Sequence, residues 1–185
     1  MTYGILETAI RQQHGWARLG LNLPIAVNLS VRNLYDPRLI DVFSGLLSTW
    51  GIEARLIDFE ITEGALVDDP ESARQVLTVI RKKGSSTYID DFGTGYSSLN
   101  YLVSLPVHFL KIDRSFVTQM TSSKQAHTVV ASVISMAHSL GLKVVAEGVE
   151  TREEADALIG LGCDEGQGYL FHKPLPPVEY EKLFA

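Results

Sequence analysis

The sequence predicts an α/β domain, a TIM-like (β/α) barrel, from two observations. Short runs rich in Val, Ile and aromatic residues alternate with segments of helical periodicity along most of the chain. A polar residue suited to binding or catalysis lies late in most of these runs. Because the carboxyl ends of all strands converge on one face of a parallel barrel, whereas an open doubly wound sheet gathers residues from only a few strands, the pattern favours the barrel.

Six apolar runs are short enough to be strands. They cover residues 24–30, 56–62, 86–92, 108–113, 143–149 and 167–171. Strands that alternate with helices predict parallel pairing through right-handed crossovers. A complete barrel has eight strands in roughly 250 residues, so we expect an incomplete barrel in which six strands are present and two N-terminal strands are missing.

The expected helices lie between these runs and carry their own start and stop signals. They cover residues 3–18, 36–51, 68–84, 122–141 and 151–162. Asp69 is a candidate N-cap before a proline, and Gly84 can end the same helix. Thr151 and Glu154 form a candidate capping box.

Composition limits the class of protein. The 185 residues carry a net charge of -6, which disfavours binding of a nucleic-acid polymer by charge alone. The single cysteine, Cys163, excludes an internal disulfide and fits a reducing, cytoplasmic setting. No apolar run reaches the ~18 residues of a membrane span, and the first residues lack the pattern of a signal peptide.

Polar side chains late in the expected strands define a candidate site. They are Asn28, Glu60, Asp90, Asp91, Lys111 and Glu147, with Gln167 near the start of the last run. Carboxylate and amide oxygens suit magnesium, manganese or calcium. Two adjacent aspartates can bridge two cations, and Lys111 can hold a water or a phosphate oxygen.

Each of these residues also has a structural interpretation. Asp90 and Asp91 precede a glycine-rich loop, where a turn with an Asx cap is common. Lys111 taken alone fits a surface lysine whose stem covers apolar neighbours. A lysine late in a strand also allows a Schiff-base aldolase as an alternative enzyme. The coincidence of several such residues at strand ends favours the shared metal site.

Six motifs resemble the EAL-domain family, the cyclic di-GMP phosphodiesterases of bacterial signalling. They are VNLS (27–30), FEITE (59–63), DDFGTGYSSL (90–99), LKIDRSF (110–116), VVAEGVE (144–150) and GCDEGQGYLFHKPLP (162–176). The resemblance implies hydrolysis of cyclic di-GMP to pGpG with two Mg²⁺ or Mn²⁺ ions, and inhibition by Ca²⁺. The family's metal ligands correspond to Asn28, Glu60, Asp90, Asp91 and Glu147.

The resemblance assigns the other roles as well. Lys111 would orient the attacking water, and Glu147 would act as ligand or base. The residues implied to meet the substrate or its water shell are Asp113, Arg114 and Gln167. Glu63 would anchor the loop that contains Gly93, Gly95 and Ser97.

The Glu-Ala-Leu segment that names the family is absent upstream of Asn28. Residues 1–185 are therefore expected to form one EAL-like domain, truncated at the N-terminus, that lacks one metal ligand and is weakly active or inactive. A homodimer or a strand-exchanged oligomer would cover the open strand edges. The parent would carry sensor or GGDEF domains and lie in the bacterial cytoplasm, alone or anchored to a membrane. The alternative function is a non-catalytic module that binds cyclic di-GMP or a protein.

Overall fold

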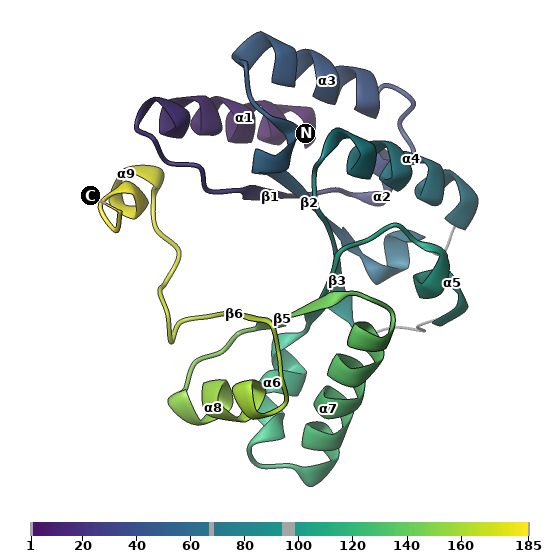
Figure 1. Ribbon diagram of the computed structural model, residues 1–185, viewed down its shortest axis with the longest axis vertical. Coiled ribbons are helices and arrows are strands. Elements are labelled where there is room, and N and C mark those ends of the chain that lie inside the picture. Colours follow the sequence, from purple (N-terminus) through teal and green to yellow (C-terminus); the bar gives the residue numbers. More distant parts are fainter. Residues whose placement is uncertain (1, 67–68, 94–98, 185) are drawn as a thin grey trace. The chain divides into compact units, whose positions relative to one another are not determined.

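The computed structural model describes residues 2–66, 69–93 and 99–184. Strands and helices alternate along this part of the chain, which confirms the predicted α/β class (Figure 1). The strands are β1 (Ile25–Asn28), β2 (Ile57–Thr62), β3 (Thr87–Phe92), β4 (Phe109–Ile112), β5 (Lys143–Glu147) and β6 (Glu165–Gln167). The described strands follow the order β1-β2-β3-β4-β5-β6 in one sheet, and the pairings β1–β2, β4–β5 and β5–β6 are parallel.

The helices agree with the expected positions and include several short ones that the sequence did not predict. The α-helices are α1 (Thr2–Arg18), α2 (Val31–Leu34), α3 (Leu39–Trp50), α4 (Pro70–Lys83), α5 (Leu99–Ser104), α6 (Arg114–Met120), α7 (Lys124–Ser139), α8 (Arg152–Gly160) and α9 (Pro177–Glu181). Two 3₁₀ turns, η1 (Ala54–Leu56) and η2 (Glu63–Leu66), flank β2. Within the described ranges no helix is long and apolar enough to cross a membrane.

The chain divides into two compact units. Unit 1 comprises residues 1–88, 104–107 and 175–185, and unit 2 comprises residues 89–103 and 108–174. In unit 1, β1 and β2 pair in register, and the rings of Phe43 on α3 and Phe59 on β2 meet edge to face at 5.1 Å. The side chain of Gln13 on α1 donates to the Leu56 carbonyl at 3.0 Å, which ties the opening helix to the start of β2.

Unit 2 contains β4, β5 and β6 with α6, α7 and α8 grouped beside them (Figure 1). Three consecutive residues of β5, Val144, Val145 and Ala146, are buried, as expected for a parallel strand covered on both faces. Helix α7 buries Val130 and Ile134 along one face. Helix α8 starts with the predicted capping box, in which the Thr151 hydroxyl accepts from the backbone N–H of its third helical residue.

The last strand differs from the prediction. β6 covers residues 165–167 instead of 167–171. The apolar run Tyr169–Phe171 is a turn, in which the Leu170 N–H donates to the Val149 carbonyl at 3.0 Å. The aromatic rings at both ends of this run are exposed. The predicted position of the last strand was therefore wrong, because the aromatic side chains of this hydrophobic run do not enter the core.

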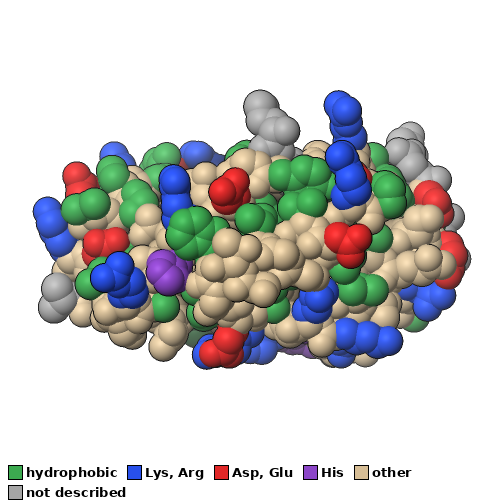
Figure 2. Space-filling model, turned by 90° about the horizontal axis from the view of Figure 1, so that it is seen from above, with side chains coloured by type: hydrophobic (Ala, Val, Ile, Leu, Met, Phe, Trp, Pro, Cys, Tyr) green, Lys and Arg blue, Asp and Glu red, His purple; other side chains and the backbone are tan. Residues whose placement is uncertain are grey.

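Charges of both signs are interspersed on the surface. On the face drawn in Figure 2, Lys and Arg side chains lie among Asp, Glu and apolar side chains. The arrangement on that face agrees with the mixed composition of the chain, in which 22 acidic residues outnumber 16 Lys and Arg residues.

Candidate metal centre

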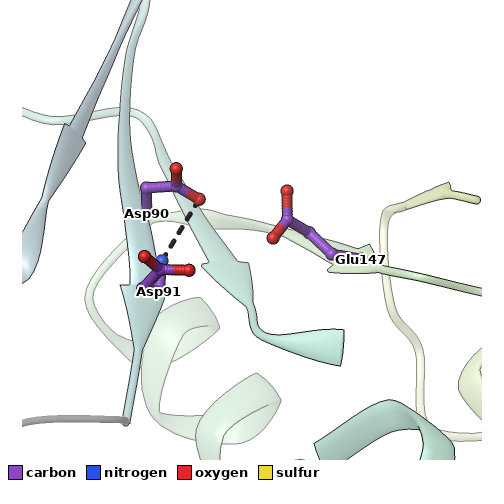
Figure 3. A group of neighbouring side chains, drawn as sticks. All are labelled: Asp90, Asp91 and Glu147. Carbon is purple, nitrogen blue, oxygen red and sulfur yellow. Dashed lines mark hydrogen bonds between the residues drawn. The ribbon is translucent and has the colours of Figure 1, made fainter. Parts of the chain in front are cut away.

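Three carboxylates gather in unit 2. Asp90 and Asp91 lie late in β3, and Glu147 is the last residue of β5. Each offers an oxygen that lies within 4.8 Å of the oxygens of the other two, and Figure 3 shows the Asp90 and Glu147 carboxylates facing one another. Ile89 and Phe92 flank the aspartates and are buried. The packing of these two side chains in the core therefore fixes the position of the two acids between them.

A buried lysine lies against this group of acids. The side-chain nitrogen of Lys111, on β4, is 3.1 Å from Asp90 Oδ1 and 2.6 Å from Glu147 Oε1. Lys111 is only 4% exposed, so the interpretation of Lys111 as a surface lysine is wrong. Its ammonium offsets part of the repulsion between the carboxylates, and a buried lysine needs such partners.

Asp91 holds an unusual backbone conformation. Its φ is 55°, which makes it the one described non-glycine residue with a positive φ. Aspartate tolerates this region better than most residues, but the conformation still costs energy and is often found at functional sites. The Asp91 N–H donates to Asp90 Oδ1 at 3.1 Å, so the turn also orients the neighbouring carboxylate (Figure 3).

The electrostatic environment of Asp91 suits a cation. Partial burial raises the pKa of its carboxyl, and the negative charges of Asp90 and Asp113 raise it further. The positive charge of Lys111 acts in the opposite direction. The group is therefore one whose charged form a metal ion would stabilise.

Asn28 and Glu60 belong to unit 1. They are register partners, Asn28 as the last residue of β1 and Glu60 within the second half of β2, and the Leu29 N–H donates to the Glu60 carbonyl at 2.8 Å. Asn28 is exposed and Glu60 is half-buried. The structure thus places these two predicted ligands opposite each other on adjacent parallel strands.

The predicted loop residues are only partly described. Glu63 is the first residue of η2, directly after β2, and is half-buried. Gly93 follows β3 with a φ of 95°, and an added Cβ there would lie 3.3 Å from the ring of Phe116. Gly95 and Ser97 lie outside the described residues.

Two of the predicted substrate residues, Asp113 and Gln167, lie at strand ends of unit 2. Asp113 caps α6, where its carboxylate accepts from the Ser115 N–H at 3.0 Å. The hydrogen bond from the Ser115 side chain is the main reason that the pKa of Asp113 is lowered. Gln167 ends β6 and is the register partner of Glu147 on β5.

Arg114 begins α6 and pairs with a residue to which the sequence assigned no role. Its Nη2 lies 2.7 Å from Oε1 of Glu150, in the loop after β5. Glu150 closes the VVAEGVE motif, only three residues after Glu147. This short separation from Glu147 was the feature of the sequence that could have identified Glu150 as a candidate site residue.

The donor set fits divalent cations. Asp90, Asp91 and Glu147 supply hard carboxylate oxygens, and the positive charge of Lys111 balances only one of three negative charges. Oxygen-only sites with excess negative charge favour Mg²⁺, Mn²⁺ or Ca²⁺ over zinc or copper. Among the residues that the structure describes, this is the one group of acids, His and Cys close enough to hold a metal.

Comparison with known proteins identifies the family of this chain. The EAL domain profile matches residues 1–174. The cyclic di-GMP phosphodiesterase PdeR of Escherichia coli K12 is 36% identical over 180 residues, which are 97% of this chain and 27% of PdeR. The chain spans between 22% and 30% of the length of the first four curated relatives that it matches.

Solved structures show the same fold. The EAL domain of Mycobacterium smegmatis DcpA is 39% identical with a TM-score of 0.91, covering 97% of this chain and 81% of that one. Klebsiella pneumoniae BlrP1, solved as a calcium and cyclic di-GMP complex, is 32% identical with a TM-score of 0.84, covering 94% of this chain and 44% of that one. The likeness confirms the predicted TIM-like α/β class. The chain belongs to the EAL domain family.

Proposed function

We propose that this chain is the phosphodiesterase domain of a bacterial signalling protein and hydrolyses cyclic di-GMP to pGpG. The observation that carries the proposal is the group formed by Asp90, Asp91 and Glu147 around the buried ammonium of Lys111. Membership of the EAL domain family and the relative named a cyclic di-GMP phosphodiesterase support the choice of substrate.

In this proposal Asp90, Asp91 and Glu147 hold divalent cations, with Mg²⁺ or Mn²⁺ as the active ions. Asn28 and Glu60 are further ligands on the strength of the family resemblance. Bound cations would lower the pKa of a water and stabilise the charge that develops on the phosphate.

Lys111 and Glu147 have roles that their own contacts support. The Lys111 ammonium holds the Asp90 and Glu147 carboxylates in place. On the strength of the family resemblance, it would also orient the attacking water. Glu147 is either a ligand or the base that accepts the water proton. Its carboxylate oxygen lies 2.6 Å from the Lys111 side-chain nitrogen and belongs to the same group of acids as Asp90 and Asp91.

The first test measures conversion of cyclic di-GMP to pGpG by liquid chromatography, with Mg²⁺ or Mn²⁺, in the full-length protein that contains these residues. Asp91→Asn should reduce the rate at least about 100-fold, because it removes a charged metal ligand. Asp156→Asn is the matched control, since Asp156 pairs with Arg152 on the exposed surface of α8. Equal rates for both variants would refute the assignment.

Residues 1–185 tested alone should show weak turnover or none. None of them supplies the glutamate of the Glu-Ala-Leu motif, which the family resemblance implies is a metal ligand. We propose that the chain acts as one EAL-like domain, as a homodimer or strand-exchanged oligomer, within a cytoplasmic parent that carries sensor or GGDEF domains. Light scattering of the purified chain tests the oligomer, and a stable monomer would contradict it.

The second candidate is a module that binds cyclic di-GMP without cleaving it. It is favoured by the solved complexes of relatives with cyclic di-GMP, such as the calcium and cyclic di-GMP complex of BlrP1. Ca²⁺ is expected to support binding and inhibit hydrolysis. Titration of the full-length protein with cyclic di-GMP in Ca²⁺, followed by addition of Mg²⁺ or Mn²⁺, separates the two: binding with no pGpG in any metal indicates the module.

A further inference from the structure

The stem of Arg114 packs directly on a glycine. Gly148, the first residue after β5, has a φ of 65°. A Cβ added there would lie 2.3 Å from Cγ, 2.6 Å from Cβ and 2.7 Å from Cδ of Arg114. No side chain larger than hydrogen fits at this position unless the arginine moves.

The charged end of Arg114 is held less firmly than its stem. The guanidinium pairs with Glu150 at 2.7 Å, and the two side chains are 58% and 38% exposed. An exposed ion pair contributes little to order on its own. The contact of the stem with Gly148 is therefore the main restriction on where the guanidinium points. Because a guanidinium carries five N–H donors, pairing with one carboxylate leaves donors for a second anion.

The loop that contains Gly148 is fixed to the end of β6. The Val149 N–H donates to the Gln167 carbonyl, and the Leu170 N–H donates to the Val149 carbonyl, both at 3.0 Å. The two backbones approach so closely that a Cβ on Gly168 would lie 2.1 Å from the Val149 carbonyl oxygen. Val149 itself is buried. The surface on which Arg114 rests is thus rigid backbone.

We propose that Gly148 is a positioning residue that holds the Arg114 guanidinium ready to bind a phosphate of the substrate. The proposal rests on the proposed function and deepens it. A planar guanidinium binds phosphate through two parallel N–H donors, so a small displacement of the stem weakens binding. The role of Gly148 is to permit the approach, and it has no part in the chemical step.

The test compares two alanine substitutions in the full-length protein. Gly148→Ala and Gly162→Ala both place a side chain on a backbone with positive φ, but a Cβ at Gly162 has nothing within 4 Å. Titration with cyclic di-GMP in Ca²⁺ should show a Kd raised about 10-fold or more for Gly148→Ala, the scale of losing a hydrogen bond to a charged group. Gly162→Ala should change the Kd by less than about twofold.

Three further readouts separate positioning from general damage. Arg114→Ala should raise the Kd as much as Gly148→Ala, and the double variant should be no worse than Arg114→Ala alone. The affinity for Mn²⁺ should stay within about twofold in Gly148→Ala, which excludes a displaced Glu147 as the cause. In turnover, KM should rise more than kcat falls, as for a lost binding interaction.

A signal that does not depend on the substrate tests the contact itself. In NMR spectra of the metal-free protein, the Arg114 Nε–H resonance, assigned by its loss in Arg114→Lys, should shift in Gly148→Ala and stay in place in Gly162→Ala. An unshifted resonance, additive effects in the double variant, or equal Kd values for the two alanine variants would overturn the proposal. Failure of the wild-type protein to bind cyclic di-GMP would overturn the proposed function and the phosphate role, while the resonance would still report the contact.

Discussion

The ammonium of Lys111 and the carboxylate of Glu147 lie 2.6 Å apart on neighbouring parallel strands. Both side chains are largely withdrawn from solvent, with exposed fractions of 5% and 21%. Two charges in such a place stabilise one another, and removal of either leaves the other with an uncompensated desolvation cost. The pair is therefore part of what keeps the acidic ends of β3 and β5 together when no cation is bound.

Lys111→Met should destabilise the metal-free protein, by about 3 kcal/mol in the free energy of unfolding, because Asp90 and Glu147 lose their compensating charge. Urea unfolding followed by circular dichroism measures this. Millimolar Mn²⁺ should recover part of the loss. Lys82→Met, at an exposed position on α4, is the control and should change the free energy by less than about 0.5 kcal/mol. A small and metal-independent effect of Lys111→Met would contradict the interpretation.

Asp91→Gly should stabilise the metal-free protein and weaken metal binding. Glycine accepts the φ of 55° without strain, and the change removes one of three neighbouring negative charges. We expect a gain of about 1 kcal/mol in the free energy of unfolding, together with at least a tenfold loss of Mn²⁺ affinity by calorimetry. Asp91→Asn provides the comparison, since it loses the charge and keeps the side chain. A glycine variant less stable than the asparagine variant would argue against backbone strain.

Asp113 makes the stability of the protein depend on pH in the acid range. Its pKa in the folded protein lies below the ordinary value of 3.8, chiefly because Ser115 donates to it. This contribution is present above pH 3.8 and is lost as pH falls through the folded pKa, because the unfolded chain binds the proton first. Ser115→Ala should reduce the contribution, so the difference in Tm between wild type and variant should shrink as pH falls from about 5 to about 3. A difference that grows over that range would contradict the assignment.

Thr151→Ala should cost about 1 kcal/mol in the free energy of unfolding, since it removes the acceptor for the first turn of α8. Thr128→Ala is the matched control: this threonine is exposed on α7 and donates only to the Lys124 carbonyl of the preceding turn. Chemical denaturation of both variants measures the difference. Equal losses would show that the capping box does not stabilise α8 beyond the intrinsic preference of the residue.

The sequence predicted the first five strands because each combines an apolar run with a buried core position. Phe59 in β2 and Val144 in β5 are both fully or almost fully buried in such runs. The sixth strand was predicted two residues too late because the hydrophobic residues near it, Tyr169 and Phe171, are exposed in a turn. Short helices such as α6 were missed because a hydrophobic run of strand type leads directly into them.

The sequence predicted which residues form the candidate site better than it predicted the contacts that these residues make. Strand position alone brought Asp90, Asp91 and Glu147 together as candidates, and the structure places their oxygens within 4.8 Å of one another. Burial of Lys111 could not be inferred from its own residue type, because it depends on acids from two other strands. The contact between Arg114 and Gly148 depends on the backbone path after β5, for which the sequence pattern offers no measure.

The register between β5 and β6 places Glu147 opposite Gln167, yet β6 contributes only three residues to the ladder. A strand this short would slip by one position if the turn before it, residues 161–164, lost or gained a residue, and a slip of one position turns every side chain to the opposite face. Insertions or deletions in that turn should therefore abolish ligand binding in proteins that still fold. If a library of variants is selected for ligand binding, insertions and deletions in residues 161–164 should be lost. Substitutions at the exposed positions of the same turn should be retained.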